Sequence, residues 1–340
     1  MQIQQRINAF QQLGTFFGSL INSSDEKLKD LLQLAKAHNG WFTEENIKFA
    51  LESWSKALSK KDLEHWISNY PLSEDNDMKT VAVVMAGNVP LVGFHDFLSV
   101  LISGHKVLAK LSSNDKILFP FIAEELIRIE PEFEDRIRFT QDKLESFDAV
   151  IATGSNNTAR YFDHYFGKYP NIIRKNRNSV AILNGTESQE QLEDLAHDIF
   201  RYFGLGCRNV SKIYIPTAYN FDPFFNAMFS WKSVINDTKY MNNYDYNKAV
   251  YLMSNIELLD NEFLLLKEDS GFSSPISVVF YERYEDLDIL KEELSKNEEN
   301  IQCIVSENNS KRSIPFGKAQ SPKLWDYADG VDTIKFLSEL

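Results

Sequence analysis

The residue best suited to covalent chemistry is Cys207, in the segment FGLGCRN at residues 203–209. Glycines permit a tight backbone there, and the neighbouring Arg208 would favour the thiolate, which is the nucleophilic form of cysteine. A buried structural cysteine explains these features at least as well, so the segment by itself leaves both interpretations open. Cys303 stands in the apolar run IQCIVS and is expected to be a small core residue.

The glycines before Cys207 do not form the dinucleotide-binding pattern G-x-G-x-x-G. The third glycine is missing, and the segment follows a predicted helix, whereas that pattern follows a strand. The chain also lacks the phosphate-binding pattern G-x-x-x-x-G-K-[ST]. Its six histidines form no H-E-x-x-H and its two cysteines have no ligand spacing, so no metal site is expected.

Three further positions follow predicted strands and could bind a ligand. Asn88 follows TVAVVMAG, although Gly-Asn-x-Pro is also ordinary turn chemistry. Gly154 and Ser155 follow SFDAVIAT and open a helix with Asn156 as its expected N-cap, where free N–H groups could receive a phosphate. Lys110 ends the strand HKVLAKL. An ordinary capped helix and a solvated lysine are the alternatives for the last two positions.

These positions lie on an alternation of strands and helices. Residues 1 to about 75 have apolar residues at helical spacing, with a capped start at Thr43. From residue 80, short apolar strands alternate with helices, and the alternation resumes after Cys207. Alternation of this kind predicts parallel sheets, so we expect an α/β protein with two lobes that follow an N-terminal helical segment.

Composition and charge restrict the partners. Of 340 residues, 43% are hydrophobic and 13% aromatic, which indicates a folded chain with a sizeable core. The formal net charge of -13 repels nucleic acid and anionic lipid, so neither is an expected partner. No apolar stretch approaches a membrane span and no signal peptide is evident, so we expect a cytoplasmic protein without membrane insertion, whose cysteines are thiols.

The motifs resemble those of the aldehyde dehydrogenase superfamily. GLGCRNVSKIYIP is similar to G-Q-x-C-x-x-x-S and aligns Gly204, Cys207 and Ser211. MAGNVPLVGFHDFLSVLISGHKVLAKLSSND resembles P-W-N-F-P and V-x-x-K-P-S-E, and DAVIATGSNNTARYF resembles F-T-G-S. GNVPLVGFHDFLSVL, the cysteine context and the closing FGKAQSPKLWDYADGVDTIKFL are closer still to the LuxC-like fatty acyl-CoA reductases. This similarity runs from about residue 39 to the end.

The resemblance implies an aldehyde-dehydrogenase-like fold. A cofactor-binding lobe of residues 1–183, completed by about 313–340, would accompany a catalytic cysteine lobe of residues 184–312. An acyl-CoA substrate would acylate Cys207 and release CoA, and a nicotinamide cofactor would reduce the thioester to a fatty aldehyde. The remaining matched positions assign Asn88 to the oxyanion and a set of residues to the cofactor, namely Lys110, Ser113, Gly154 and Ser155.

Two departures from the superfamily refine these expectations. Ser113 stands where NAD-specific members carry a carboxylate, which favours NADPH, with NADH possible. Arg174 aligns with the glutamate that activates water in aldehyde-oxidising members, so no general base is evident and thioester reduction is favoured. Glu268 and Asp269 lie near the position of another superfamily glutamate but cannot be matched residue by residue.

Two other functions stay open. The chain could be an aldehyde dehydrogenase that runs in the oxidative direction, or a non-catalytic subunit of a fatty-acid reductase complex. We also expect a homo-oligomer, with VDTIKFL as an assembling C-terminal strand, and an acyl-transferring protein is a conceivable partner.

Overall fold

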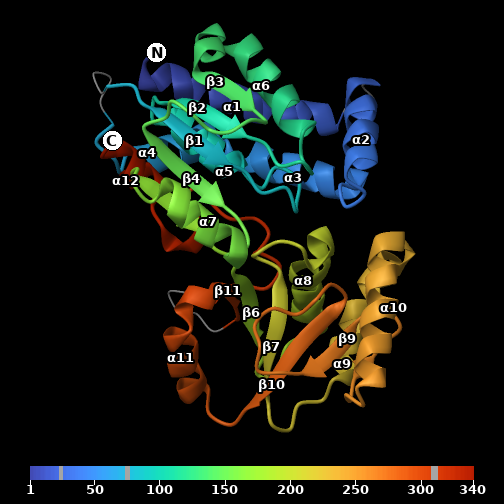
Figure 1. Ribbon diagram of the computed structural model, residues 1–340. Helices are drawn as coiled ribbons and strands as arrows, with labels where there is room; N and C mark the ends of the chain where they lie inside the picture. The colour runs from blue at the N-terminus through green and yellow to red at the C-terminus, as the bar shows by residue number, and fades with distance from the viewer. Residues whose placement is uncertain (23–25, 73–76, 308–312) are drawn as a thin grey trace. The chain divides into compact units, whose positions relative to one another are not determined.

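The computed structural model describes residues 1–22, 26–72, 77–307 and 313–340, and the chain divides into two compact units (Figure 1). Unit 1 consists of Met1–Lys175 and Lys323–Leu340, and unit 2 of Asn176–Pro322. The boundaries expected from the sequence lie near residues 183 and 313. In the structure, unit 1 ends directly after β5 (Asn171–Arg174), the last strand of its sheet, and the chain returns to unit 1 about ten residues later than expected.

The N-terminal segment of unit 1 is helical, as expected. Its helices are α1 (Ile3–Ile21), α2 (Glu26–His38), α3 (Glu44–Ala57) and α4 (Lys60–Ile67). Thr43 is the N-cap of α3, and its side chain accepts a hydrogen bond from the Asn46 N–H, which confirms the predicted start. The helices bury large side chains, among them Phe10 and Trp66, which are fully buried. Packing of these apolar faces stabilises the segment more than helix propensity does.

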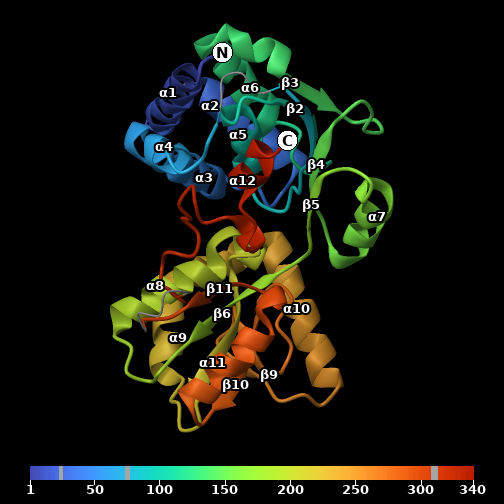
Figure 2. The same ribbon diagram turned by 90° about the vertical axis from the view of Figure 1, so that its left-hand side faces the viewer.

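A five-stranded parallel sheet forms the centre of unit 1, in the order β3-β2-β1-β4-β5. Its elements are β1 (Thr80–Val84), α5 (Phe94–Ile102), β2 (Lys106–Lys110), α6 (Leu118–Ile129), η1 (Pro131–Arg136), β3 (Ile137–Thr140), β4 (Ala149–Thr153), α7 (Asn156–Phe166) and β5 (Asn171–Arg174). Phe162 and Phe166 of α7 pack on one face of the sheet, and α5 lies on the other (Figure 2).

The C-terminal tail returns to unit 1 and ends in η5 (Ala328–Gly330) and α12 (Thr333–Ser338). The expected strand at VDTIKFL is therefore wrong. Asp332 caps α12 by accepting a hydrogen bond from the Lys335 N–H, and Ile334 and Leu337 are buried at helical spacing. Two histidines hold the tail: His95 Nε2 contacts the Leu324 carbonyl at 2.8 Å in a part-buried site, and His105 Nε2 contacts the Leu337 carbonyl at 2.9 Å in a buried one.

The described residues of unit 2 form a seven-stranded sheet in the order β12-β11-β6-β7-β10-β9-β8, in which the β8–β9 pair is antiparallel and the other pairs are parallel. Its elements are β6 (Asn178–Ile182), α8 (Gln189–Phe200), η2 (Arg201–Gly204), β7 (Val210–Pro216), α9 (Asp222–Met228), η3 (Phe229–Asn236), α10 (Thr238–Met253), β8 (Leu259–Asp260), β9 (Leu265–Glu268), β10 (Val278–Tyr284), α11 (Leu287–Lys296), η4 (Glu298–Asn300), β11 (Ile301–Val305) and β12 (Ser313–Ile314).

Helices cover both faces of this sheet. Leu290 and Leu294 of α11 pack on Val180 and Tyr214, and Tyr244 of α10 packs on Phe280. The strand register places these partners on one face, because paired residues of neighbouring strands point to the same side. Figure 2 shows α8 and α9 on the opposite face. The sheet is therefore buried on both sides, as parallel sheets require.

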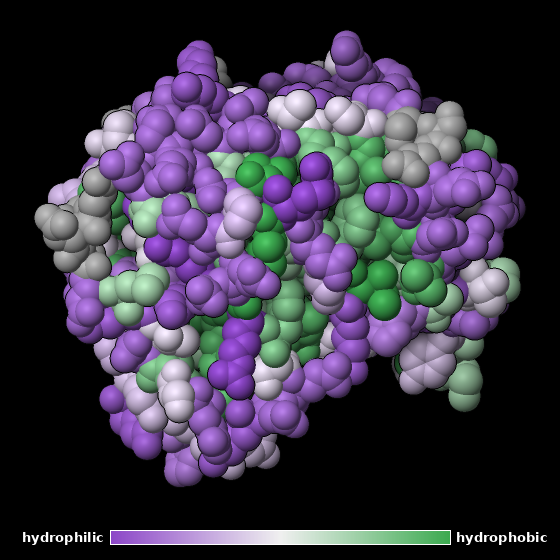
Figure 3. Space-filling view, turned by 90° about the horizontal axis from the view of Figure 1, so that it is seen from above, coloured by the Kyte–Doolittle hydropathy of each residue, from purple (hydrophilic) through white to green (hydrophobic). Residues whose placement is uncertain are grey.

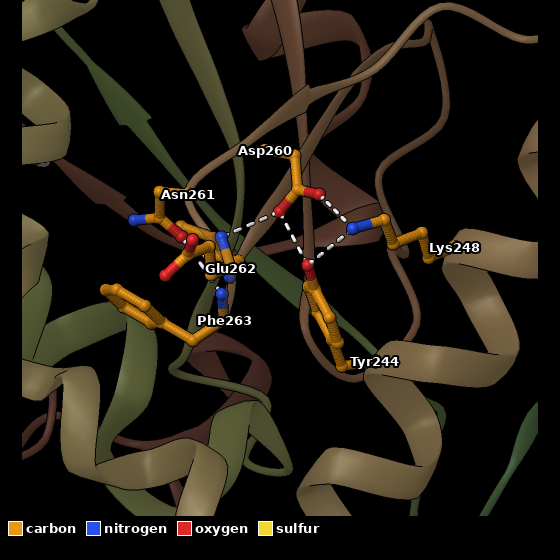
Figure 4. Close-up of polar contacts among 7 residues, drawn as sticks. Tyr244, Lys248, Asp260, Asn261, Glu262 and Phe263 are labelled. Atoms are coloured by element: carbon orange, nitrogen blue, oxygen red, sulfur yellow. Dashed lines mark hydrogen bonds and ion pairs between the residues drawn. The ribbon is translucent and has the colours of Figure 1, made fainter.

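A polar cluster joins α10 to the turn after β8 (Figure 4). Asp260 Oδ1 accepts hydrogen bonds from the Tyr244 hydroxyl at 2.7 Å and from the Glu262 N–H at 2.8 Å, and Lys248 Nζ lies 2.6 Å from Asp260 Oδ2. Burial is the main cause that raises the pKa of Tyr244 to about 12, and the hydrogen bond to Asp260 is the second. A tyrosine that keeps its proton over the physiological range serves here as a hydrogen-bond donor that closes the turn.

In the part of the chain that the structure describes, no helix is long and apolar enough to cross a membrane. Most residues on the face shown in Figure 3 are hydrophilic, with hydrophobic residues visible near its middle.

Candidate active site

Cys207 lies on the connection between α8 and β7, in unit 2. It is half-buried, whereas Cys303 is buried in β11, as expected, and these two cysteines form no disulfide with each other. The Ser179 hydroxyl, on β6, donates a hydrogen bond to the Cys207 carbonyl at 3.0 Å. Ser179 is fully buried, so it fixes the backbone of Cys207 from the sheet side. Of the two thiols, Cys207 is the more exposed.

The residue after the cysteine is held by a neighbouring loop. Arg208 Nε donates a hydrogen bond to the Ala319 carbonyl at 2.7 Å. The same loop donates two backbone N–H groups to the Asp198 carboxylate, from Gly317 at 2.7 Å and from Ala319 at 3.1 Å. Burial raises the pKa of Asp198 to about 7, against these two hydrogen bonds, which lower it. Asp198 at the end of α8 and Arg208 thus fasten one loop beside Cys207.

In unit 1, the five predicted residues Asn88, Lys110, Ser113, Gly154 and Ser155 all lie at or beyond the carboxyl ends of β1, β2 and β4. The strand order reverses between β1 and β4, since β2 and β3 extend to one side and β4 and β5 to the other. Ligands of open parallel sheets bind at the carboxyl edge where the order reverses. The sheet therefore gathers these residues at the edge that suits a dinucleotide.

The loop with Asn88 is packed closely against the loop after β2. A Cβ atom on Gly87 would lie 2.5 Å from the Ser112 hydroxyl, so only glycine fits there. Asn39 Nδ2, from the segment between α2 and α3, contacts the Gly87 carbonyl at 3.5 Å and the Asn114 carbonyl at 3.4 Å. The N-terminal helices therefore help to set the distance between these two loops.

Asp115 anchors the far end of the Asn88 loop. The Leu91 N–H donates a hydrogen bond to its Oδ2 at 3.4 Å, and Leu91 has a φ of 59°, in the left-handed region. Burial raises the pKa of Asp115 to about 7, while hydrogen bonds from the Leu91 and Leu118 backbone and the nearby His38 lower it. The position of Asn88 thus depends on a carboxyl group that titrates near neutral pH.

Lys110 and Ser113 lie at the end of β2, where residues 111–114 contain no acidic side chain. Lys110 Nζ donates a hydrogen bond to the Asp142 carbonyl at 3.0 Å, and Lys116 Nζ contacts Gln141 Oε1 at 3.4 Å. Ser113 is exposed, and its carbonyl contacts His38 Nε2 at 2.6 Å. Asp115, the nearest acid in the sequence, is buried and turned to the backbone. This edge is suited to a phosphate or a ribose.

Gly154 and Ser155 lead into α7. Ser155, not Asn156, is the N-cap of this helix, because its hydroxyl accepts a hydrogen bond from the Thr158 N–H at 3.2 Å. The expected N-cap was one residue too late, since both residue types cap helices well. A Cβ atom on Gly154 would lie 2.9 Å from the Phe162 ring and 3.0 Å from Thr158. Glycine therefore lets β4 turn directly into a helix whose exposed start can meet an anion.

Arg174 is structural. It ends β5, where it forms a buried ion pair with Asp96 of α5 and donates a hydrogen bond to the Thr333 hydroxyl at 3.0 Å. Its guanidinium thus ties the sheet to α5 and α12, and it leaves no carboxylate at the position matched to a general base. Two acids were considered near another superfamily glutamate. Glu268 is exposed at the end of β9, and Asp269 is ion-paired with Lys267 and accepts a hydrogen bond from the Gly271 N–H.

The anchoring residues Asn39, Asp115, Asp198 and Asn209 were missed by the sequence analysis. Each is nearly or fully buried and bonds to backbone groups of a loop that carries or adjoins a candidate residue. The sequence feature that could have identified them is a polar residue within or beside a matched motif, such as Asn209, which lies two positions after Cys207.

The residues of unit 1 fit a phosphorylated dinucleotide. Its sheet has a reversal of strand order, its α7 start is exposed, and Lys110 lies beside a loop without an exposed carboxylate at residues 111–114. Such a combination attracts anionic groups through backbone N–H donors and a local positive charge.

Comparison with known proteins agrees with this geometry. The family described as Acyl-CoA reductase (LuxC) matches residues 19–224, more than half of the chain. The chain belongs to this family. No curated protein sequence matches it.

Solved structures of aldehyde dehydrogenases share the fold. Aldehyde dehydrogenase 21 from Physcomitrella patens, in complex with succinate, is 15% identical with a TM-score of 0.65, and the match covers 86% of this chain and 71% of that one. A mutant of the indole-3-acetaldehyde dehydrogenase AldA from P. syringae, in complex with NAD+, is 13% identical with a TM-score of 0.65, covering 92% and 74%.

An NADP-dependent enzyme of E. coli is 13% identical with a TM-score of 0.65, covering 93% of this chain and 80% of that one. At such identities the likeness establishes the fold alone. The expected aldehyde-dehydrogenase-like architecture, with two α/β units built on parallel sheets and an N-terminal helical segment, is confirmed.

Proposed function

We propose that this protein is an NADPH-dependent acyl-CoA reductase that forms a fatty aldehyde through a thioester on Cys207. The observation that carries the proposal is the half-buried Cys207, held on a fixed backbone in a member of the acyl-CoA reductase family. Membership shows an oxidoreductase of this type. The substrate, cofactor and direction are the parts proposed here.

The Cys207 thiolate attacks the acyl carbonyl, a carbon–sulfur bond forms, and the bond to CoA breaks so that CoA leaves as a thiolate. The Asn88 amide and the Cys207 N–H would donate hydrogen bonds to the oxyanion of the tetrahedral species. The bound nicotinamide cofactor supplies the hydride that reduces the thioester carbonyl. Release of the aldehyde then returns the Cys207 thiolate, so the protein ends the cycle unchanged.

NADPH is proposed over NADH from the residues at the end of β2. Ser113 offers a hydroxyl where a carboxylate would repel a 2′-phosphate, and the Lys110 ammonium would attract it. Ser155 and the start of α7, with Gly154 before it, would receive another phosphate group. The E. coli NADP-dependent enzyme with this fold is consistent with the choice, and AldA with NAD+ shows that the fold also accepts the other cofactor.

Reduction is proposed over aldehyde oxidation because the position matched to a water-activating glutamate is Arg174, which is buried in an ion pair. A thioester that must wait for hydride survives longer without a general base beside it.

The proposal includes assembly of two or more copies, which light scattering of the purified protein would measure.

The test is a product assay with a fatty acyl-CoA and either cofactor. We expect aldehyde and free CoA in equal amounts, with NADPH giving the larger kcat/KM. NAD+-dependent formation of acid from aldehyde without CoA would favour the oxidative dehydrogenase. Failure of calorimetry to detect binding of either cofactor would favour a non-catalytic subunit.

A further inference from the structure

The turn before Cys207 has an unusual backbone. Tyr202, Phe203 and Gly204 have φ angles of 55°, 59° and 76°, so three consecutive residues are left-handed. Glycine adopts this region readily, whereas residues with a side chain do so at a cost, and aromatic residues are rare there. Backbone strain of this kind persists only where surrounding contacts determine it, and it concentrates at functional sites.

One side chain spans this turn. Asn209 Nδ2 donates to the Arg201 carbonyl at 2.7 Å, before the left-handed residues, and Asn209 Oδ1 accepts a hydrogen bond from the Gly206 N–H at 2.8 Å, after them. Nδ2 also contacts the carbonyls of Asp198 at 3.0 Å and Ile199 at 3.3 Å, at the end of α8. The carboxamide thus connects the end of the helix, the start of the turn and the residue preceding Cys207.

The chemistry of these partners requires an amide. Three carbonyl oxygens face the donor end and one N–H group faces the acceptor end, which matches a carboxamide in a single orientation. Asn209 is 2% exposed, so water does not replace these bonds. An aspartate of the same shape would set a carboxylate oxygen against the three carbonyls.

The same residue also holds the backbone around the cysteine. The Asn209 N–H donates to the Gly206 carbonyl at 3.0 Å, and the Asn209 carbonyl accepts from the Ser179 N–H at 3.3 Å. Together with the Ser179 hydroxyl on the Cys207 carbonyl, these contacts fix the backbone on both sides of Cys207 while its side chain stays half-exposed. The direction of the thiol is therefore set by the turn.

We propose that Asn209 is a positioning residue, whose carboxamide holds residues 202–206 in the left-handed turn and so aims the Cys207 thiol at the acyl carbonyl. This inference rests on the proposed function of Cys207 as nucleophile. It assigns Asn209 no contact with substrate. Its loss should lower the reactivity of Cys207 and kcat, and leave KM for acyl-CoA nearly unchanged.

The experiment compares Asn209→Asp with Asn247→Asp in the full-length protein. Asn247 is a matched control because it is a buried asparagine of unit 2 that donates a hydrogen bond to the Ile276 carbonyl, outside the turn. The first readout is the rate of alkylation of Cys207 by iodoacetamide across a range of pH, followed by peptide mass spectrometry. The second is kcat and KM with acyl-CoA and NADPH.

For Asn209→Asp we expect alkylation of Cys207 to slow at least about tenfold, with a shifted pH profile, and kcat to fall about 100-fold, because small misplacements of reacting groups have effects of this size. KM for acyl-CoA should stay within about threefold, since binding of the ground state is not affected. Asn247→Asp should lose stability without these changes. Equal alkylation and equal kcat in the two variants would overturn the proposal.

If Asn209→Asp does not fold, a second pair of variants tests whether the left-handed turn sets the reactivity of Cys207. Gly204 is exposed, and a Cβ atom there would meet only the Ile199 carbonyl, at 3.6 Å, so a substitution acts through its φ of 76°. Asparagine tolerates the left-handed region and valine does not. Slow alkylation in Gly204→Val with normal alkylation in Gly204→Asn supports the proposal, and equal rates in both contradict it.

The two readouts separate this inference from the proposed function. Alkylation needs no acyl-CoA. If the wild-type protein forms no aldehyde, the proposed function fails, while the dependence of Cys207 alkylation on Asn209 still tests the positioning role by itself.

Discussion

The loop that carries Asn88 in unit 1 and the turn of residues 202–206 before Cys207 in unit 2 (the Cys207 turn) are anchored by different kinds of side chain. Each carries a candidate catalytic residue near left-handed residues, Leu91 in the first and Tyr202 to Gly204 in the second. The loop is anchored by the carboxyl group of Asp115, whereas the turn is anchored by the carboxamide of Asn209. A carboxyl group titrates and a carboxamide does not, so only the loop should respond to pH through its anchor.

The largest effect that sharpens this comparison is expected from Asn88→Ala. Removal of one oxyanion donor lowers the rate about 10²–10³-fold, so acylation of Cys207 should slow by that factor. Rapid-quench measurement of CoA release gives the rate. Asn88→Asp, which has the same shape but no amide donor, should be at least as slow. An acylation rate within about threefold of wild type in both variants would mean that the loop serves only the fold.

A smaller effect is expected on the pH dependence of stability. The pKa of Asp115 is about 7 when folded, well above the ordinary value for an aspartate. Between these values the folded state holds a proton that the unfolded state has lost, so the free energy of unfolding falls as pH rises towards 7. Each such group contributes a slope of at most about 1.4 kcal/mol per pH unit.

Asp115→Asn should therefore flatten the fall in the free energy of unfolding between about pH 4 and pH 7, as measured by urea denaturation. Asp198 in unit 2 also has a pKa of about 7, so Asp198→Asn is the matched variant and should remove its own share of the slope. Asn209→Asp should add a slope of its own, because burial against three carbonyl oxygens disfavours the ionised carboxyl group in the folded state. An unchanged slope in Asp115→Asn would contradict the assignment of its raised pKa.

The smallest effect is expected from Lys110→Met, at the end of the strand that precedes Ser113. Loss of one charged hydrogen-bond donor should raise KM for NADPH roughly tenfold, and KM for NADH by less, since NADH lacks the 2′-phosphate. Lys106→Met, at the other end of the same strand, is the control and should leave both values unchanged. Equal effects of Lys110→Met on the two cofactors would argue against a 2′-phosphate contact.

The sequence predicted the features that repeat along the chain. Alternation of apolar strands with helices indicated the parallel sheets, and the run around Cys303 indicated a core strand. The short strands β3 and β5, of four residues each, were too brief to distinguish from loop. A strand was predicted at VDTIKFL because its β-branched residues favour strands. The structure has a helix there, which the Asp332 cap and the packing of Leu337 stabilise.

The anchors could not be predicted because they depend on contacts between distant parts of the chain. Asp115 bonds to a backbone group 24 residues away, and Asn39 reaches loops 48 and 75 residues away. The Asn209 carboxamide bonds only to residues within eleven positions, but its role follows from the left-handed turn, which no sequence pattern predicted. Position in a motif indicates which residues react, and tertiary contacts decide how they are held.

The most direct test of the central claim is intact-protein mass spectrometry of wild type, Cys207→Ser and Cys303→Ser after mixing with a fatty acyl-CoA, followed by a chase with NADPH. We predict an acyl adduct on wild type and on Cys303→Ser, none on Cys207→Ser, and loss of the adduct as aldehyde when NADPH is added. An adduct that persists in Cys207→Ser, or wild-type protein that no acyl-CoA modifies, would contradict the account.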